Sequence, residues 1–141
     1  MSGAAQQLDE LLGSTEPNAS WHDAALLQLE LDYVGQKAIS LWDLYVGDPE
    51  ANDSQQRERS RRGRLILNGL HFWVIEGPHD LNACGKRPWL VSDGPIHDSP
   101  TEEGKRLAAL LPEDSVGWYL FFTRRNAFMY CGARSAQFEW Q

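Results

Sequence analysis

The sequence predicts an α+β domain, in which an antiparallel sheet of about six strands carries one or two short helices packed on it. Three observations support this fold. Apolar and polar residues alternate with a period of two in several segments, as is typical of half-buried strands. Most of these segments are joined by short turns, whereas parallel pairing would need long crossovers. The length of 141 residues suits a single domain over residues 1–141.

The N-terminal residues 1–20 are predicted to form a helix and a linker arm. Within the helical segment at residues 4–12, Leu8, Leu11 and Leu12 share one face. Because this face is apolar, we expect the short helix to dock on the sheet.

A first β-hairpin is predicted over residues 25–46. In its first strand Leu27, Leu29 and Leu31 alternate with polar residues, which gives the strand one acidic, solvent-facing side. The returning strand at residues 38–46 alternates less regularly, which indicates either a bulge or cover on both faces.

The middle of the chain is mostly polar or rich in Pro and Gly. Residues 47–63 are expected to form a mobile polar loop with at most one helical turn. The next predicted strand covers residues 64–76, where Gly69 indicates a bulge or a close backbone approach. Residues 77–98 are expected to be mostly loop, with a possible short strand at residues 89–91.

The C-terminal region is predicted to hold one helix and three strands. The helix covers residues 101–111, two strands cover residues 116–123 and 127–133, and after a turn at Arg134-Ser135 a last strand covers residues 136–140. Both faces of the hairpin formed by the first two of these strands are apolar. We expect one face to cover the core and the other to meet a helix, since soluble monomers seldom expose so large an apolar patch.

The net charge of −7 is unevenly distributed along the chain. Residues 1–56 contain ten acidic residues and one Lys, whereas residues 57–141 contain twelve basic and ten acidic residues. This charge opposes binding to nucleic acid or to an anionic membrane, and it favours basic partners. There is no signal-peptide pattern and no membrane-spanning apolar run, and the two Cys are isolated, so we expect a cytoplasmic protein with reduced thiols.

The predicted contact residues for a basic protein partner lie in the acidic half. The charged candidates are Glu30, Asp32, Asp43, Asp48, Glu50 and Asp53, and the candidate aromatic anchors are Trp42 and Tyr45. Aromatic residues are enriched at interfaces, and an acidic surface would steer a basic partner toward it. The alternative for each acid is that it only keeps the protein soluble.

Three His-Asp pairs raise the alternative of a small metal-binding or hydrolytic enzyme. The pairs begin at His22, His79 and His97, and imidazole and carboxylate are both ligands of Zn²⁺ and ferrous iron. Adjacent residues in a strand point to opposite faces, so one pair cannot readily share an ion. The favoured interpretation is that each Asp accepts backbone N–H bonds, as Asp23 would where its strand begins, and we expect no cofactor.

Two further features allow other kinds of site. Cys84 lies beside two cationic residues, which can lower a thiol pKa, and a cysteine hydrolase would need it close to His71 or His79. A ligand-binding β domain would instead use a pocket lined by Trp118, Phe122 and Phe128.

A basic run precedes the strand at residues 64–76. It comprises Arg57, Arg59, Arg61, Arg62 and Arg64. Arg clusters can bind phosphate, but no aromatic residues interleave this one. We therefore expect a solvated face, or ion pairs with Asp48, Glu50 and Asp53.

Two stretches resemble a group of small bacterial proteins that are uncharacterised or immunity-protein-like domains found beside toxin systems. They are Trp21-His-Asp-Ala24 with the alternating strand after it, and the C-terminal β region that ends in Ala136-Gln-Phe-Glu-Trp140. The resemblance covers about a third of the chain and brings no catalytic residues. It implies a non-enzymatic protein that binds and neutralises a partner, here a toxin or effector of basic charge.

Overall fold

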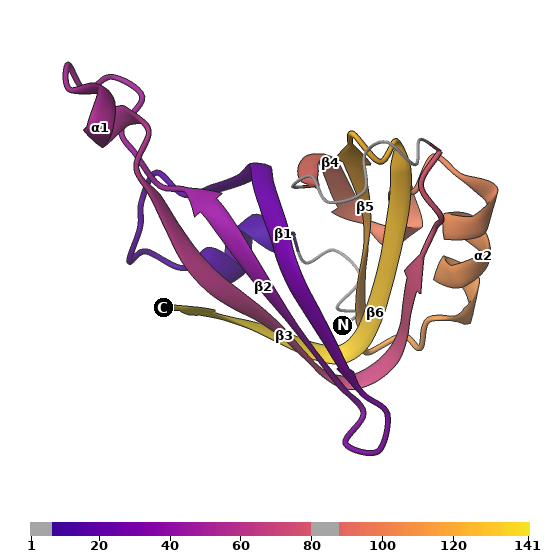
Figure 1. Ribbon diagram of the computed structural model, residues 1–141. Helices are drawn as coiled ribbons and strands as arrows, with labels where there is room; N and C mark the ends of the chain where they lie inside the picture. The colour runs from indigo at the N-terminus through magenta and orange to yellow at the C-terminus, as the bar shows by residue number, and fades with distance from the viewer. Residues whose placement is uncertain (1–6, 80–87) are drawn as a thin grey trace.

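The computed structural model describes residues 7–79 and 88–141, and within them six antiparallel strands close into a barrel (Figure 1). The strand order around the barrel is β1-β2-β3-β6-β5-β4. The strands are β1 (Ser20–Asp32), β2 (Lys37–Tyr45), β3 (Ser60–Ile75), β4 (Trp89–Pro95), β5 (Val116–Thr123) and β6 (Ala127–Trp140). The helices are α1 (Ser54–Arg57) and α2 (Glu102–Leu110), with 3₁₀ turns η2 (Leu8–Leu12) and η4 (Ile96–Asp98). The predicted α+β fold with an antiparallel sheet is confirmed.

Strand β2 shows how the sequence pattern sets the inner face of the barrel. Ala38, Ser40, Trp42 and Leu44 are buried, while the residues between them are more exposed. The one polar member, Ser40, is satisfied because its hydroxyl donates to the carbonyl of Leu65 (3.2 Å) and accepts from the Trp42 indole N–H (2.7 Å). The alternation of β2 is therefore regular, and no bulge is needed in it.

The irregularity lies in β1 instead. Leu29 and Leu31 pair with the inward residues Ser40 and Ala38, as the alternation predicts. Leu26 pairs with Trp42, and the register shifts between Leu26 and Gln28. This shift removes Leu27 from the predicted leucine stripe and gives its inward place to Leu26.

Strands β3 and β6 are longer than predicted, and they pair along nearly their whole length. β3 begins at Ser60, inside the predicted polar loop, because residues 60–63 pair with the end of β2. The predicted turn at Arg134-Ser135 is wrong, since β6 runs through it and pairs with β3 at Asn68 and Leu70 on either side of Gly69. Gly69 has a φ of +65° next to a register shift, which confirms the predicted irregularity there.

The barrel interior is filled by large aromatic side chains. Trp21 and Trp42 meet edge to face with ring centroids 5.1 Å apart, and Trp42 stacks with Phe122 at 6.0 Å. The predicted N-terminal helix is the 3₁₀ turn η2, which buries Leu8 and Leu12 against this core.

Helix α2 covers the outer face of the β5–β6 hairpin (Figure 1). Leu107, Ala108 and Leu111 pack there against Ile96 and Tyr130. The expected intramolecular cover of the second apolar face is thus confirmed. The helix begins at an N-cap, Thr101, whose hydroxyl accepts from the N–H of Gly104 at 3.0 Å. In the part of the chain described, no helix has the length and apolar character needed to cross a membrane.

Candidate functional site

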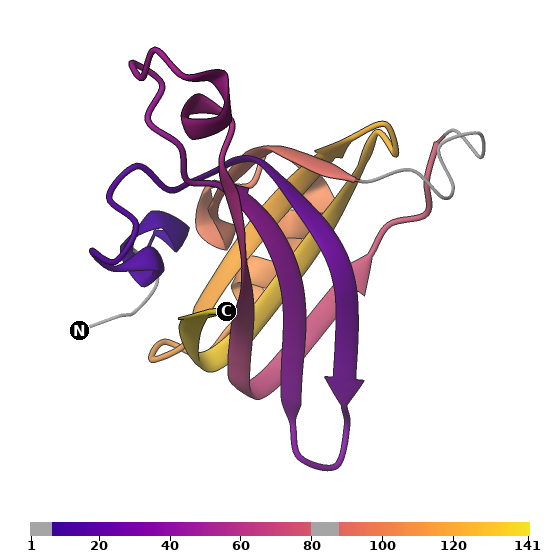
Figure 2. The ribbon, with the colours of Figure 1, turned by 60° about the vertical axis from the view of Figure 1, so that its left-hand side comes forward.

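An acidic segment projects from one end of the barrel. Residues 47–58, here called the acidic projection, connect β2 to β3 and include helix α1 (Figures 1 and 2). Their charged residues are four acids, Asp48, Glu50, Asp53 and Glu58, and one base, Arg57. The predicted single helical turn is confirmed as α1.

The projection is organised by its own side chains. Asp48 accepts a hydrogen bond from the N–H of Glu50 (2.9 Å), and Asp53 caps α1 by accepting from the N–H of Gln55 (3.0 Å). Arg57 donates to the carbonyls of Ala51 and Asn52 at 2.8 and 2.9 Å. The acids therefore project from a hydrogen-bonded loop, whose shape is set before any partner arrives.

A hollow lies at the base of this projection. It has a volume of about 420 Å³ and is lined by Asp43, Tyr45, Glu58, Ser60 and Trp89, and it is called the ring hollow below. The rings of Tyr45 and Trp89 are nearly parallel, with an interplanar angle of 11° and centroids 6.3 Å apart. Tyr45 is 41% exposed, so its ring is open to solvent. The hollow thus combines two aromatic rings with two carboxylate residues.

Five of the eight predicted contact residues gather at this end of the barrel. They are Asp43 and Tyr45, which line the ring hollow, and Asp48, Glu50 and Asp53 on the projection. Trp42 lies on the inner face of β2 and is fully buried. It therefore cannot anchor a partner.

Glu30 and Asp32 lie at the opposite end of β1, beside the β1–β2 turn (Figure 2). Asp32 pairs with the first residue of β2, while Tyr45 is the last. At ~3.4 Å per residue, β2 separates them by about 27 Å. The six predicted acidic contact residues therefore fall into two separate groups.

Three residues of the ring hollow, Glu58, Ser60 and Trp89, escape prediction from the sequence. Glu58 is hidden in the Arg-rich run, and Trp89 comes from a segment that reads mostly as loop. The chain brings them together because β4 closes the barrel against β1, where Ala25 pairs with Trp89. The only sequence signal was Trp89 itself, at the start of the possible short strand.

The Arg-rich run does not pair with the acids of the projection. Arg59 and Arg61 both bind Glu16, with shortest N–O distances of 2.7 and 2.8 Å. Their hydrogen bonds hold the pKa of the Glu16 carboxyl below its ordinary value. Arg61 also lies over the Trp140 ring at 5.5 Å. These ion pairs connect the N-terminal arm to β3, and the group of Glu16, Arg59 and Arg61 is called the arginine clamp below. Arg59 and Arg61 thus pair with Glu16 and not, as predicted, with Asp48, Glu50 and Asp53.

The His residues do not form a metal centre in the part of the chain described. His22 Nε2 lies 3.5 Å from the Asp23 carboxylate, and His79 Nε2 lies 3.3 Å from Glu76. His97 is exposed in η4. Among residues 7–79 and 88–141, no three His, Cys, Asp or Glu side chains are placed to hold a metal ion. Asp80 and Cys84 lie outside the described residues.

Asp23 takes a backbone conformation that the sequence did not predict, and its predicted role as a backbone cap stays a prediction. It lies where the register between β1 and β2 shifts, and its φ is 63°, in the left-handed region. Asp tolerates this conformation better than most residues with a side chain. Asp23 thus shapes the backbone at the start of β1.

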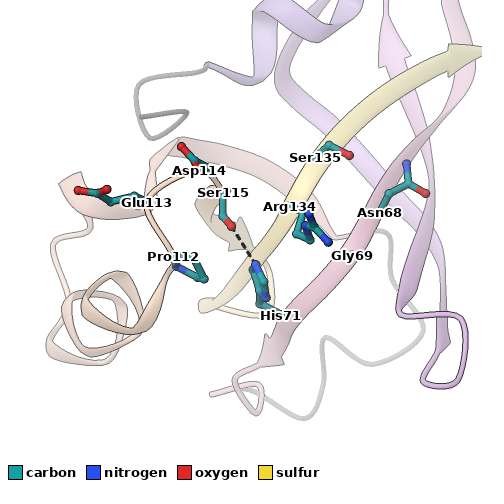
Figure 3. Close-up of a pocket in the computed structure, with 9 residues that line it drawn as sticks. All are labelled: Asn68, Gly69, His71, Pro112, Glu113, Asp114, Ser115, Arg134 and Ser135. Atoms are coloured by element: carbon teal, nitrogen blue, oxygen red, sulfur yellow. Dashed lines mark hydrogen bonds between the residues drawn. The ribbon is translucent and has the colours of Figure 1, made fainter. Parts of the chain in front are cut away.

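A second hollow, of about 720 Å³, lies near the β1–β2 turn (Figure 3). Its centre is a hydrogen bond of 2.8 Å between His71 Nε2 and the hydroxyl of Ser115, and Arg134 lines another side. Figure 3 shows that the carboxylates of Glu113 and Asp114 point away from this bond. The hydrogen bond between His71 and Ser115 joins strand β3 to the segment before β5. A Ser hydroxyl beside an imidazole is also the arrangement of an activated nucleophile.

The remaining predicted sites are separated or inert. Trp118 and Phe122 are buried inside the barrel, while Phe128 packs on the outer face with the α2 cluster, so these three rings do not line one pocket. Burial raises the pKa of Cys131 to about 12, which keeps it a neutral thiol.

Comparison with protein families, with curated proteins and with solved structures found no match.

Proposed function

We propose that this protein is a binding domain of the immunity type, which neutralises a basic protein partner through the acidic projection and the ring hollow. The observation that carries the proposal is the gathering of Asp43, Tyr45 and the projection acids with Glu58 and Trp89 at one end of the barrel. Protein contact surfaces commonly place aromatic anchors at their centre and polar groups around the rim.

The physical argument has an electrostatic and an entropic part. Acids clustered on one projection attract a basic partner and speed its encounter, an effect that falls as salt rises. Because Asp48, Asp53 and Arg57 already hold the loop in shape, less conformational entropy is lost on binding. A partner whose basic surface is covered in this way would be blocked from its own target.

The test is capture of partners from the native host at low salt, with the purified protein as bait. The key variant is Asp48→Asn/Glu50→Gln/Asp53→Asn, since Asn keeps the side-chain oxygen that Asp48 and Asp53 use as caps. The matched control, Glu30→Gln/Asp32→Asn/Asp114→Asn, removes the same charge from the other end. We expect a basic protein that is released by raised salt, lost with the key variant and retained with the control. Equal capture by both variants would contradict the proposal.

A second candidate function is ester hydrolysis in the hollow of Figure 3, favoured by the bond between His71 and Ser115. In that reaction Ser115 Oγ would attack the acyl carbon, and His71 would take its proton and pass it to the leaving alkoxide. A water molecule, deprotonated by His71, would then attack the acyl-serine, which releases the acid and restores the free Ser115 hydroxyl. A fluorophosphonate probe tests this: attack by Ser115 forms an O–P bond and releases fluoride. Labelling that disappears in Ser115→Ala and stays in Ser92→Ala would support it, whereas an unlabelled protein would reject it.

A further inference from the structure

The ring hollow has the chemistry of a receptor for a planar cation. It is lined by Asp43, Glu58, Tyr45, Trp89 and Ser60, residues that carry two carboxylates, two aromatic rings and a hydroxyl. Carboxylates attract a cation directly, and the negative faces of aromatic rings attract it through their quadrupole. Both kinds of group act on one enclosed ligand only if they line the same hollow, as they do here.

The geometry of the two rings indicates the shape of the ligand. Rings in direct face-to-face contact would lie ~3.5–4.0 Å apart, whereas the centroids of Tyr45 and Trp89 are 6.3 Å apart. The rings therefore do not cover each other fully, and Tyr45 is 41% exposed, so a further flat group can approach its ring. Since their planes differ by only 11°, one flat group can lie parallel to both.

Among the residues that the structure describes, two of the basic side chains near the hollow along the chain are directed elsewhere. Arg57 donates to the carbonyls of Ala51 and Asn52, and Arg59 binds Glu16 in the arginine clamp. Arg62 lies opposite Asp43 in the register between β2 and β3. Glu58 is for this reason the carboxylate to which we assign the first contact with a ligand.

We propose that the ring hollow receives one arginine side chain of the basic partner. The guanidinium stacks on Tyr45 and Trp89 and donates hydrogen bonds to Glu58, with Asp43 adding to the negative field. A lysine fits less well, because its ammonium is a compact, strongly hydrated charge, whereas the guanidinium is planar, stacks on rings and matches a carboxylate with two donors. This inference rests on the proposed function and names the side chain that the partner supplies.

The test uses capped single amino acids as probes. N-acetylarginine methylamide, its lysine counterpart and the neutral citrulline counterpart are titrated into the full chain, and the Trp indole N–H signals are followed by NMR. The Trp89 signal is assigned with Trp89→Phe. We expect this signal to move and saturate with arginine, to respond at least about twofold more weakly to lysine, and to stay unchanged with citrulline.

Variants locate the binding. Glu58→Gln and Tyr45→Leu are each expected to weaken arginine binding, read from the Trp89 signal, by about two- to fivefold or more, and Glu30→Gln, at the other end of the barrel, is the matched control. Circular dichroism confirms that each variant is folded, and Tyr45→Val serves in place of Tyr45→Leu if that variant is not. Equal binding of citrulline, or wild-type affinity in Glu58→Gln, would overturn the inference.

The outcomes separate the inference from the proposed function. If no arginine binding is detected while partner capture still depends on the projection acids, the arginine receptor is rejected and the binding function stands. If arginine saturates the hollow while capture does not depend on the projection acids, the receptor stands and the proposed binding surface is rejected.

Discussion

At the scale of single residues, two polar side chains show how a specific partner or a backbone role shapes the fold. Ser40 is the one polar residue on the inner face of β2, and it links the Trp42 indole to the Leu65 carbonyl. Asp23 has a left-handed backbone conformation that was not predicted from the neighbouring sequence. Both residues contribute to stability through geometry rather than through apolar burial.

Asp23→Ala is expected to lower the free energy of unfolding by about 1 kcal/mol, because Ala pays the left-handed backbone cost that Asp tolerates. Asp23→Gly should be as stable as the wild type or more so, since Gly adopts positive φ without this cost. Urea unfolding measures both. An equal loss in the two variants would show that the carboxylate contact with His22 matters instead, and a fall in bound zinc or iron would revive the metal hypothesis.

Ser40→Ala is expected to cost about 1–3 kcal/mol, because it leaves the Trp42 N–H and one bond of the Leu65 carbonyl unsatisfied in the core. In the Trp42→Phe background the indole donor is already gone, so the same change should cost less. Thermal unfolding of the two single variants and the double variant gives the coupling. Additive losses would show that the Ser40–Trp42 bond contributes nothing of its own.

At the scale of elements, the N-terminal arm is attached by polar contacts as well as apolar ones. Glu16 is only 7% exposed and is held by Arg59 and Arg61, while the Trp140 indole donates to the Leu12 carbonyl at 3.2 Å. Leu8 and Leu12 fill the adjacent part of the core. Because Arg59 and Arg61 pair with Glu16 in the arginine clamp, these two residues do not compete with a basic partner for the carboxylates of the acidic projection.

The clamp predicts a pH dependence of stability. The folded state lowers the pKa of Glu16, so the charged carboxylate stabilises the fold above its ordinary pKa of 4.5. That contribution is lost as the pH falls through the lowered folded value. The difference in melting temperature between wild type and Glu16→Gln should therefore be largest near neutral pH and shrink below about pH 4.5. With the exposed control Glu102→Gln the difference should stay small throughout, and a constant gap for Glu16→Gln would contradict the clamp.

At the scale of the whole molecule, the barrel is closed by seams of unequal strength. β3 and β6 pair along nearly their full length, whereas β1 and β4 share the pair Ala25–Trp89 and the bond from the Leu26 N–H to the Pro88 carbonyl at 3.2 Å. The ring hollow lies at the weak seam, since Trp89 is part of it. A partner that binds Tyr45 and Trp89 together would brace this closure.

Hydrogen exchange is expected to reflect these seams. Amides between β3 and β6 should exchange most slowly, and those between β1 and β4 fastest among the strands, because few backbone bonds resist local opening there. Mass spectrometry after deuterium labelling measures both regions. Equal protection at the two seams would show that the barrel opens only as a whole.

The sequence by itself determined the approximate positions of most strands, their antiparallel pairing and the acidic character of the projection, because period-two alternation and short turns are local properties. It also determined that the C-terminal hairpin needs cover on both faces. Only the tertiary structure decided the closure of the barrel, the pairing of Glu16 with the Arg-rich run, and the separation of Glu30 and Asp32 from the other acids. These features depend on register and on contacts between distant segments, and a shift of one residue, as between Leu26 and Gln28, changes which side chains face inward.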